Sequence, residues 1–136
     1  MKKILSVESP EGHYHAKSVI LWCFDDRFSG VLEKFLKEHP DQHFDVIKVA
    51  GGVKQLVSPE HETDRDFILR QIAASIKLHG AENVGIMAHD ECGAYGGKRE
   101  VPFYEEELKK GEEVLKEFLH IGVTKMFVGF DGIYEV

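Results

Sequence analysis

Residues 18–27 read SVILWCFDDR, an apolar run that ends abruptly in two acidic residues and an arginine. The first six, Ser18 to Cys23, are rich in β-branched and aromatic side chains, a composition typical of a strand that is buried on both faces. Strands of this kind belong to parallel sheets that are covered by helices. The sequence therefore predicts a central strand with Cys23 at its carboxyl end and a polar loop directly after it.

The rest of the chain alternates strand patterns and helix patterns. Apolar, β-rich runs predict further strands at His43 to Val49, Val84 to Ala88 and Lys125 to Phe130. Amphipathic segments predict helices from Ser29, the expected N-cap, to about His39, from Thr63 or Asp64 to Gly80, and from Pro102 to Gly122. In the last helix we expect four residues to face the sheet, namely Leu108, Leu115, Phe118 and Leu119.

This alternation predicts the α/β class, with a mostly parallel central sheet flanked by helices in three layers. Parallel strands need long crossover connections, and the expected helices supply them. A chain of 136 residues is the size of one core, so residues 1–136 are expected to form a single domain.

Composition and charge exclude several classes of function. The chain has 17 Lys and Arg against 24 Asp and Glu, a formal net charge of -7, and would repel the phosphate backbone of a nucleic acid. Its longest apolar run, Val19 to Phe24, is far shorter than the roughly 20 residues of a membrane helix. The N-terminal lysines are followed by Glu8 and Glu11 instead of the apolar core of a secretion signal. We therefore expect a cytoplasmic protein that binds neither nucleic acid nor membrane.

Side chains with metal-binding chemistry follow two of the expected strands. Cys23 ends the first strand, and His89 and Cys92 follow the third. Because the carboxyl ends of neighbouring parallel strands meet at one edge of a sheet, these three side chains can converge. Two thiolates and one imidazole are a typical zinc ligand set, and three protein ligands leave a position open for water or substrate.

Other interpretations of the two cysteines stay open at this point. Cysteine is often a small buried apolar residue, and a single His-x-x-Cys spacing arises by chance in many chains. A disulfide between Cys23 and Cys92 is possible, although a reducing compartment argues against it. A redox pair more often has the spacing Cys-x-x-Cys. The metal interpretation gains weight because Asp25 and Arg27 follow Cys23 closely.

The pattern Cys23-x-Asp25-x-Arg27, followed by His89-x-x-Cys92-Gly93, resembles the paired signature of the β-class carbonic anhydrases. The resemblance extends in the same order over residues 18–136 and includes VIKVAGG at 46–52. It implies a β-carbonic-anhydrase-like fold in which Cys23, His89 and Cys92 ligate Zn2+. It also implies that Asp25 and Arg27 are a catalytic dyad, in which the arginine holds the aspartate by paired hydrogen bonds.

The same resemblance implies the reversible hydration of carbon dioxide to bicarbonate by zinc-bound hydroxide, in a homodimer or a higher homo-oligomer. The resemblance identifies the metal more closely than it identifies the small-molecule substrate. Relatives of this fold hydrolyse carbonyl sulfide or carbon disulfide with the same ligands, and a non-catalytic zinc-binding member would keep the fold without the reaction. The turn Ala50-Gly51-Gly52 also departs from the Ala-Gly-Asn that is common in the family.

Overall fold

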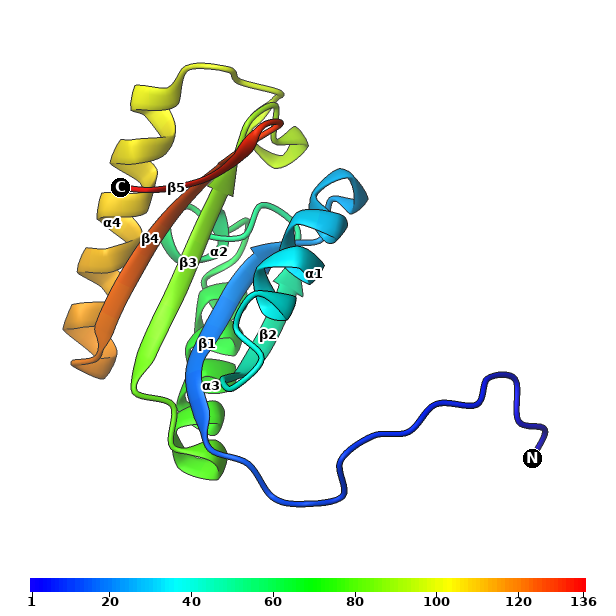
Figure 1. Ribbon diagram of the computed structural model, residues 1–136. Coiled ribbons are helices and arrows are strands. Elements are labelled where there is room, and N and C mark those ends of the chain that lie inside the picture. The colour runs from blue at the N-terminus through cyan, green and yellow to red at the C-terminus, as the bar shows by residue number, and fades with distance from the viewer.

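The computed structural model describes residues Met1 to Val136, and its helices and strands form three layers (Figure 1). The strands are β1 (Ala16–Cys23), β2 (His43–Val49), β3 (Asn83–His89), β4 (Gly122–Gly129) and β5 (Gly132–Glu135). The helices are α1 (Ser29–Lys37), α2 (Lys54–Val57), α3 (Glu62–His79) and α4 (Val101–Leu119), with short 3-10 helices η1 (Asp26–Phe28) and η2 (Gly93–Tyr95).

One five-stranded sheet with the order β2-β1-β3-β4-β5 forms the middle layer. The pairs β1–β2, β1–β3 and β3–β4 are parallel, whereas β5 pairs antiparallel with β4 after the two-residue turn of Phe130 and Asp131. Strand β2 lies on one side of β1, and β3, the next strand in the sequence, lies on the other side of β1. This change of direction brings the carboxyl ends of β1 and β3 side by side, which is where open α/β sheets bind their ligands.

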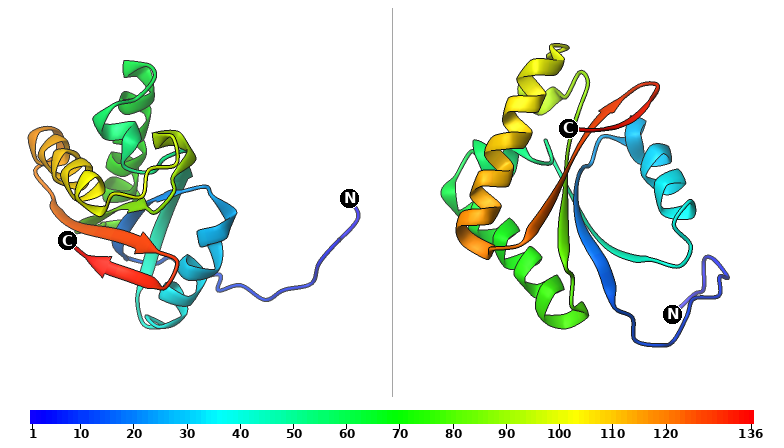
Figure 2. Two further views of the ribbon diagram at one scale, coloured as in Figure 1. Left: turned by 90° about the horizontal axis from the view of Figure 1, so that it is seen from above. Right: turned by 60° about the vertical axis from the view of Figure 1, so that its left-hand side comes forward.

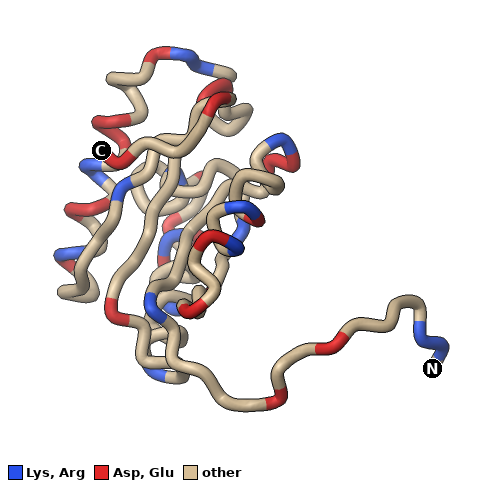
Figure 3. The backbone as a smooth tube through the Cα atoms, viewed as in Figure 1, with Lys and Arg blue, Asp and Glu red and all other residues tan.

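Helices cover both faces of the sheet, so the central strands are apolar on both sides. Figure 2 shows α1 on one face and α2, α3 and α4 on the other. No residue from Val19 to Cys23 is more than 3% exposed. Charged residues lie mainly on helices and loops, and β3 has none (Figure 3). None of the helices has the length and apolarity that a bilayer span requires.

The predicted fold class is confirmed, because the mostly parallel sheet lies between two layers of helices as expected. The predicted strand from His43 to Val49 coincides with β2, and the first and third predicted strands lie within β1 and β3. Leu108 and Leu115 of α4 are fully buried, as their helical spacing predicted.

The predicted helix starts were wrong in detail. Phe28, not Ser29, is the N-cap of α1, and the Ser29 hydroxyl instead accepts a hydrogen bond from Lys48 Nζ at 2.9 Å. Helix α3 begins at Glu62 after the N-cap His61. Asp64 lies inside the first turn and accepts a hydrogen bond from the His61 backbone N–H, which is the arrangement of a capping box.

The end of α4 also differs from the prediction. The helix ends at Leu119, and His120 takes the left-handed conformation that closes it, so Gly122 is the first residue of β4 and not a helix stop. Phe118 is 57% exposed instead of facing the sheet. Strand β5 was not predicted, because its four residues GIYE have no period long enough to distinguish a strand from a loop.

A polar cluster around Asp45 of β2 attaches the N-terminal segment to the rest of the molecule. Its carboxylate accepts hydrogen bonds from the hydroxyls of Tyr14 (2.5 Å) and Ser75 (2.6 Å) and contacts His79 Nδ1 at 2.8 Å. Figure 1 shows that the chain before this point runs away from the layers. Burial alone would raise the pKa of Asp45, but these hydrogen bonds outweigh it and lower the pKa below its usual value. The cluster therefore favours the ionised carboxylate in the folded state.

We predict that Asp45→Asn destabilises the fold by about 1–2 kcal/mol near neutral pH, because it removes a charged acceptor shared by three donors. A lowered folded-state pKa adds stability above the unfolded value of about 4 and loses it as the pH falls through the folded value. The difference in unfolding free energy between the wild type and Asp45→Asn should therefore shrink as the pH falls below about 4. Urea unfolding between pH 7 and pH 3 measures it, with the exposed Asp41→Asn as the matched control. A difference that grows at low pH would contradict the assignment.

Candidate metal centre

Three buried side chains converge at the carboxyl end of the central strands. Cys23 is the last residue of β1, His89 is the last residue of β3, and Cys92 follows three residues later. One potential ligand atom from each, a sulfur or a ring nitrogen, lies within 4.8 Å of the other two. The three residues are 3%, 1% and 2% exposed. The structure thus brings together the residues that the sequence analysis singled out.

The orientation of His89 suits a metal ligand. Its Nδ1 lies 2.8 Å from the carbonyl oxygen of Asp90, and because a carbonyl can only accept, Nδ1 carries the proton. Nε2 then has a free lone pair, and this buried atom has no hydrogen-bond partner in the structure. The ring of Phe28 packs against the imidazole with the centroids 4.4 Å apart. A buried acceptor without a donor is costly, and a cation at this position would satisfy it.

The two cysteines form a coupled pair. Hydrogen bonding with the Cys92 thiol lowers the pKa of Cys23 to about 4, although burial opposes the shift, and the same bond raises the pKa of Cys92. Burial alone would lower the pKa of His89, but the neighbouring Cys23 sulfur and the Asp90 carbonyl outweigh it and raise the pKa. The thiolate form of Cys23 is therefore favoured beside the Cys92 thiol. A metal ion would take the place of the Cys92 thiol proton.

Asp25 and Arg27 form an ion pair directly after Cys23. The Asp25 carboxylate caps η1 by accepting the Arg27 backbone N–H at 3.1 Å. Arg27 Nη2 and Nε also donate to it, at 2.7 Å to Oδ2 and 3.1 Å to Oδ1. The side-chain hydrogen bonds from Arg27 lower the pKa of Asp25, and the same contacts raise the pKa of Arg27. Both groups are therefore charged at neutral pH, and the carboxylate has a fixed direction.

A mostly apolar cavity of about 510 Å³ opens onto this cluster. Its lining includes Cys23, Phe24, Asp25, Ala50, Cys92 and Ala94. Such a cavity accepts a small, weakly hydrated molecule and brings it next to both sulfur atoms and the Asp25 carboxylate.

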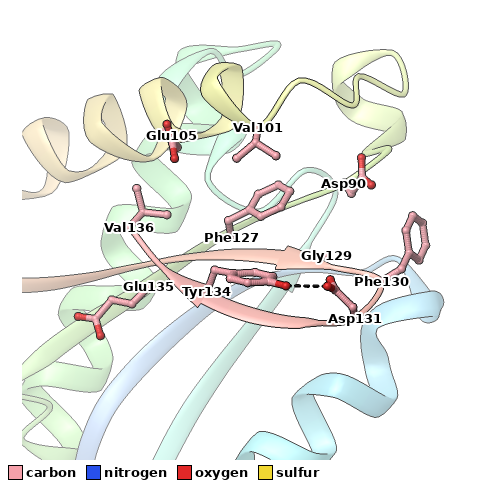
Figure 4. Close-up of a pocket in the computed structure, with 10 residues that line it drawn as sticks. All are labelled: Asp90, Val101, Glu105, Phe127, Gly129, Phe130, Asp131, Tyr134, Glu135 and Val136. Atoms are coloured by element: carbon pink, nitrogen blue, oxygen red, sulfur yellow. Dashed lines mark hydrogen bonds between the residues drawn. The ribbon is translucent and has the colours of Figure 1, made fainter.

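A second cavity of about 550 Å³ lies between α4 and the β4–β5 hairpin, and Figure 4 shows its lining. The rings of Phe127 and Tyr134 face it, and the Tyr134 hydroxyl donates to Asp131 at 2.7 Å. Asp90 borders it as well, but no cysteine or histidine does. This cavity therefore lacks the donor set of the metal centre.

Two further residues support the centre, and the sequence analysis missed the first of them. The Tyr104 hydroxyl on α4 accepts the Cys92 backbone N–H at 3.2 Å and donates to the Lys98 carbonyl at 2.7 Å. These two hydrogen bonds hold the loop at both Cys92 and Lys98. The second is Glu91, which lies between two of the proposed ligands in the sequence and is typical there of a surface carboxylate, but its side chain accepts a hydrogen bond from Arg27. No local pattern could reveal either contact, because each joins segments that only the folded loop brings together.

The fold and this cluster define an α/β protein of the β-carbonic-anhydrase type. Residues 14–136 match the model of the family described as "Putative carbonic anhydrase", and the chain belongs to that family. Among curated relatives, an uncharacterized protein of Rickettsia conorii is 25% identical over 150 residues, a match that covers 98% of this chain and 81% of the relative.

Solved structures share the same fold. The carbonic anhydrase of Streptococcus mutans is 18% identical with a TM-score of 0.66, covering 95% of this chain and 87% of that one. The β-carbonic anhydrase isoform I of Trichomonas vaginalis is 16% identical with a TM-score of 0.61, covering 96% and 87%. The apo form of a carbon disulfide hydrolase is 16% identical with a TM-score of 0.62, covering 90% and 79%. At these identities the likeness concerns the fold.

The turn Ala50-Gly51-Gly52 supports the cluster from the β2 side. The Gly51 N–H donates to Cys23 Sγ at 3.3 Å. This bond helps to lower the pKa of Cys23, and burial, which acts in the opposite direction, does not outweigh the hydrogen bonds. Gly52 has φ +53°, and a Cβ placed there would lie 2.8 Å from the Met87 carbonyl oxygen and 3.3 Å from the Cys23 nitrogen. The turn must therefore carry glycine at position 52, both for its backbone conformation and for its close contact with β3.

We predict that Gly52→Ala destabilises the protein more than Gly96→Ala does and lowers the amount of metal that it binds. Both positions are left-handed, so each alanine costs about 1 kcal/mol in backbone conformation. A Cβ at Gly96 meets nothing within 4 Å, whereas at Gly52 it meets backbone atoms, and the crowding should add about 1–3 kcal/mol. Urea unfolding and elemental analysis of both variants measure the difference. Equal losses in the two variants would show that the contact at Gly52 is unimportant.

Proposed function

We propose that this protein is a zinc lyase that reversibly hydrates carbon dioxide to bicarbonate. The observation that carries the proposal is the Asp25–Arg27 ion pair beside the Cys23–His89–Cys92 cluster, with Asp25, Cys23 and Cys92 lining the same cavity. A purely structural metal site needs no oriented carboxylate at its entrance. Membership of the carbonic anhydrase family supports the same reaction class.

Cys23, His89 and Cys92 would hold the metal. Two sulfurs and one imidazole nitrogen are a donor set that zinc prefers, and three protein donors leave one tetrahedral position open. A zinc ion bound there supplies Lewis-acid chemistry that lowers the pKa of a water molecule from about 15.7 toward 7. The free lone pair of His89 and the low pKa of Cys23 support this assignment on the protein's own side.

Asp25 and Arg27 would orient the attacking water. The Asp25 carboxylate is held ionised by Arg27, so it can only accept a hydrogen bond. It therefore directs the O–H of a water molecule toward itself and leaves an oxygen lone pair free for the substrate carbon. The apolar wall that includes Phe24, Ala50 and Ala94 favours carbon dioxide, which has no strong hydrogen-bonding groups.

A second candidate is the hydrolysis of carbon disulfide or carbonyl sulfide. The apolar lining of the cavity favours these sulfur compounds as well as carbon dioxide. The fold of a carbon disulfide hydrolase is also among the similar structures. Hydration and hydrolysis use the same oriented water, so rate measurements with all three compounds decide between them.

The central prediction concerns the dyad. Asp25→Asn keeps the size of the side chain but adds an N–H donor and removes the charge, so it should lower the carbon dioxide hydration rate by about 10²-fold or more. Arg27→Ala should cause a similar loss by releasing Asp25. Stopped-flow hydration and elemental analysis on the same samples measure both effects. About one zinc per chain is expected in the wild type and in both variants.

Two controls make this experiment specific. Asp41→Asn changes an exposed carboxylate that has no ion pair and does not line the cavity, and it should keep the wild-type rate. Cys92→Ser should lose most of the zinc, because it removes a thiolate from the donor set. Unchanged rates in Asp25→Asn would reject the dyad. Zinc-loaded wild type that is inactive with all three compounds would favour the non-catalytic zinc-binding function.

We further propose that the chain self-associates as a homodimer or a higher homo-oligomer. Phe24 and Phe130 lie near the candidate centre and are 62% and 59% exposed, and β5 leaves one edge of the sheet unpaired. Exposed aromatic side chains and a free sheet edge are typical of surfaces that a partner covers. Light scattering of the zinc-loaded protein should give at least twice the mass of the chain, and a stable monomer at micromolar concentration would contradict the proposal.

A single domain over residues 1–136 and a cytoplasmic location stay predictions.

A further inference from the structure

Glu91 has an unusual backbone conformation for its residue type. It lies between His89 and Cys92 and has φ +53°, in the left-handed region that non-glycine residues rarely adopt. Its backbone N–H donates to the Lys98 carbonyl at 2.9 Å, and this bond fixes the position of the residue in the loop. Glycine would take this conformation at lower cost, so the glutamate side chain needs an explanation.

The side chain of Glu91 contacts the arginine of the proposed dyad. Glu91 Oε2 accepts a hydrogen bond from Arg27 Nη1 at 3.3 Å, and the Glu91 carbonyl oxygen accepts one from Arg27 Nη2 at 3.2 Å. Asp25 already binds the Nε and Nη2 side of the same guanidinium. Arg27 is therefore held between the loop after β1 and the loop after β3.

Arg27 would be poorly fixed by Asp25 alone. Its side chain is 46% exposed, and Asp25 is only two residues away on the same loop, so the pair could move as one unit. The rings of Phe28 and Phe130 lie 5.7 Å and 5.5 Å from the guanidinium carbon and limit its movement on the other sides. Glu91 is the contact that ties the pair to the loop that carries Cys92.

A second arginine holds Glu91 itself. Its other carboxylate oxygen, Oε1, accepts a hydrogen bond from Arg99 Nη2, at the far end of the same loop. Asp25, Arg27, Glu91 and Arg99 thus form a row of alternating negative and positive charges. The Glu91 side chain is 24% exposed, less than either arginine, so it is the most sheltered link between the two guanidinium groups.

We infer that Glu91 is a positioning residue, which holds Arg27 in the orientation that directs Asp25 toward the metal centre. The shortest contact of Arg27 is with Asp25, at 2.7 Å against 3.3 Å for the Glu91 carboxylate, so Asp25 stays the main partner and Glu91 restrains the pair without displacing it. The inference rests on the proposed function, since it concerns the dyad of that reaction. Its geometric part, the restraint on Arg27, is measurable without substrate.

The experiment compares Glu91→Ala and Glu91→Gln with the wild type. Both variants keep a Cβ, so the cost of the left-handed conformation does not change. The alanine removes the acceptor, whereas the glutamine keeps one acceptor oxygen and loses the charge. The control is Glu106→Gln, an exposed glutamate of α4 without an ion pair, which should behave as the wild type does.

Two readouts separate positioning from a merely structural role. The first is solvent exchange of the Arg27 Nε–H, followed by NMR on the zinc-loaded protein without substrate, with the signal identified by its loss in Arg27→Lys. Exchange should become several-fold faster in Glu91→Ala and be intermediate in Glu91→Gln. The second is the hydration rate, which should fall about tenfold in Glu91→Ala and less in Glu91→Gln, at unchanged zinc content.

The outcomes distinguish this inference from the proposed function. Wild-type exchange and wild-type rate in Glu91→Ala would overturn the inference and leave the function intact. Loss of zinc or of the fold in both variants would assign Glu91 to the stability of the loop and would also overturn it. If the zinc-loaded wild type shows no hydration, the proposed function fails. Faster exchange in Glu91→Ala would then still support the restraint on Arg27.

Discussion

The parallel pairing of β1 with β3 is the constraint on which the candidate site depends. These strands come from distant parts of the sequence, but the sheet order places Val19 opposite Val84 and Leu21 opposite Ile86. The strands then end at the same edge, where Cys23 and His89 lie within a few ångströms of each other. Each strand is buried on both faces, so a one-residue slip in register would move every side chain to the opposite face, disrupt its packing against the helices, and is strongly disfavoured. Packing of the sheet thus fixes the distance between two of the three proposed ligands.

Hydrogen bonds of the loops fix the third ligand and the surroundings. Tyr104 holds the backbone at Cys92, and the Gly51 N–H points at the Cys23 sulfur. Burial raises the pKa of Tyr104 to about 12, so its hydroxyl stays protonated and can donate to Lys98 while it accepts from Cys92. These partners belong to α4, the β2 turn and the loop itself, and none of them requires a metal. The cluster is therefore largely organised before any metal binds.

The sequence predicted those parts that rest on local pattern. Cys23, Asp25, Arg27, His89 and Cys92 could be found because they follow apolar strands at short spacings, and the strand order then brought them together. Contacts between loops could not be predicted, since Glu91 and Tyr104 act on residues that no spacing relates to them. Strand β5 exists through its pairing with β4, not through its own four residues. Phe118 and Leu119 both continue the apolar stripe of α4, but at the last turn only Leu119 packs against the core.

The ion pairs of Arg27 affect both the charge of the metal centre and the position of Asp25. Hydrogen bonding lowers the pKa of Cys23 to about 4, which favours its thiolate, and Arg27 is the nearest permanent cation along the chain. Two carboxylates, Asp25 and Glu91, neutralise that cation, so it lends little positive charge to the sulfur atoms. The cluster thus keeps the negative charge that attracts a divalent cation. An arginine without these partners would weaken metal binding, so the two carboxylates that pair with Arg27 also preserve the affinity of the site for a divalent cation.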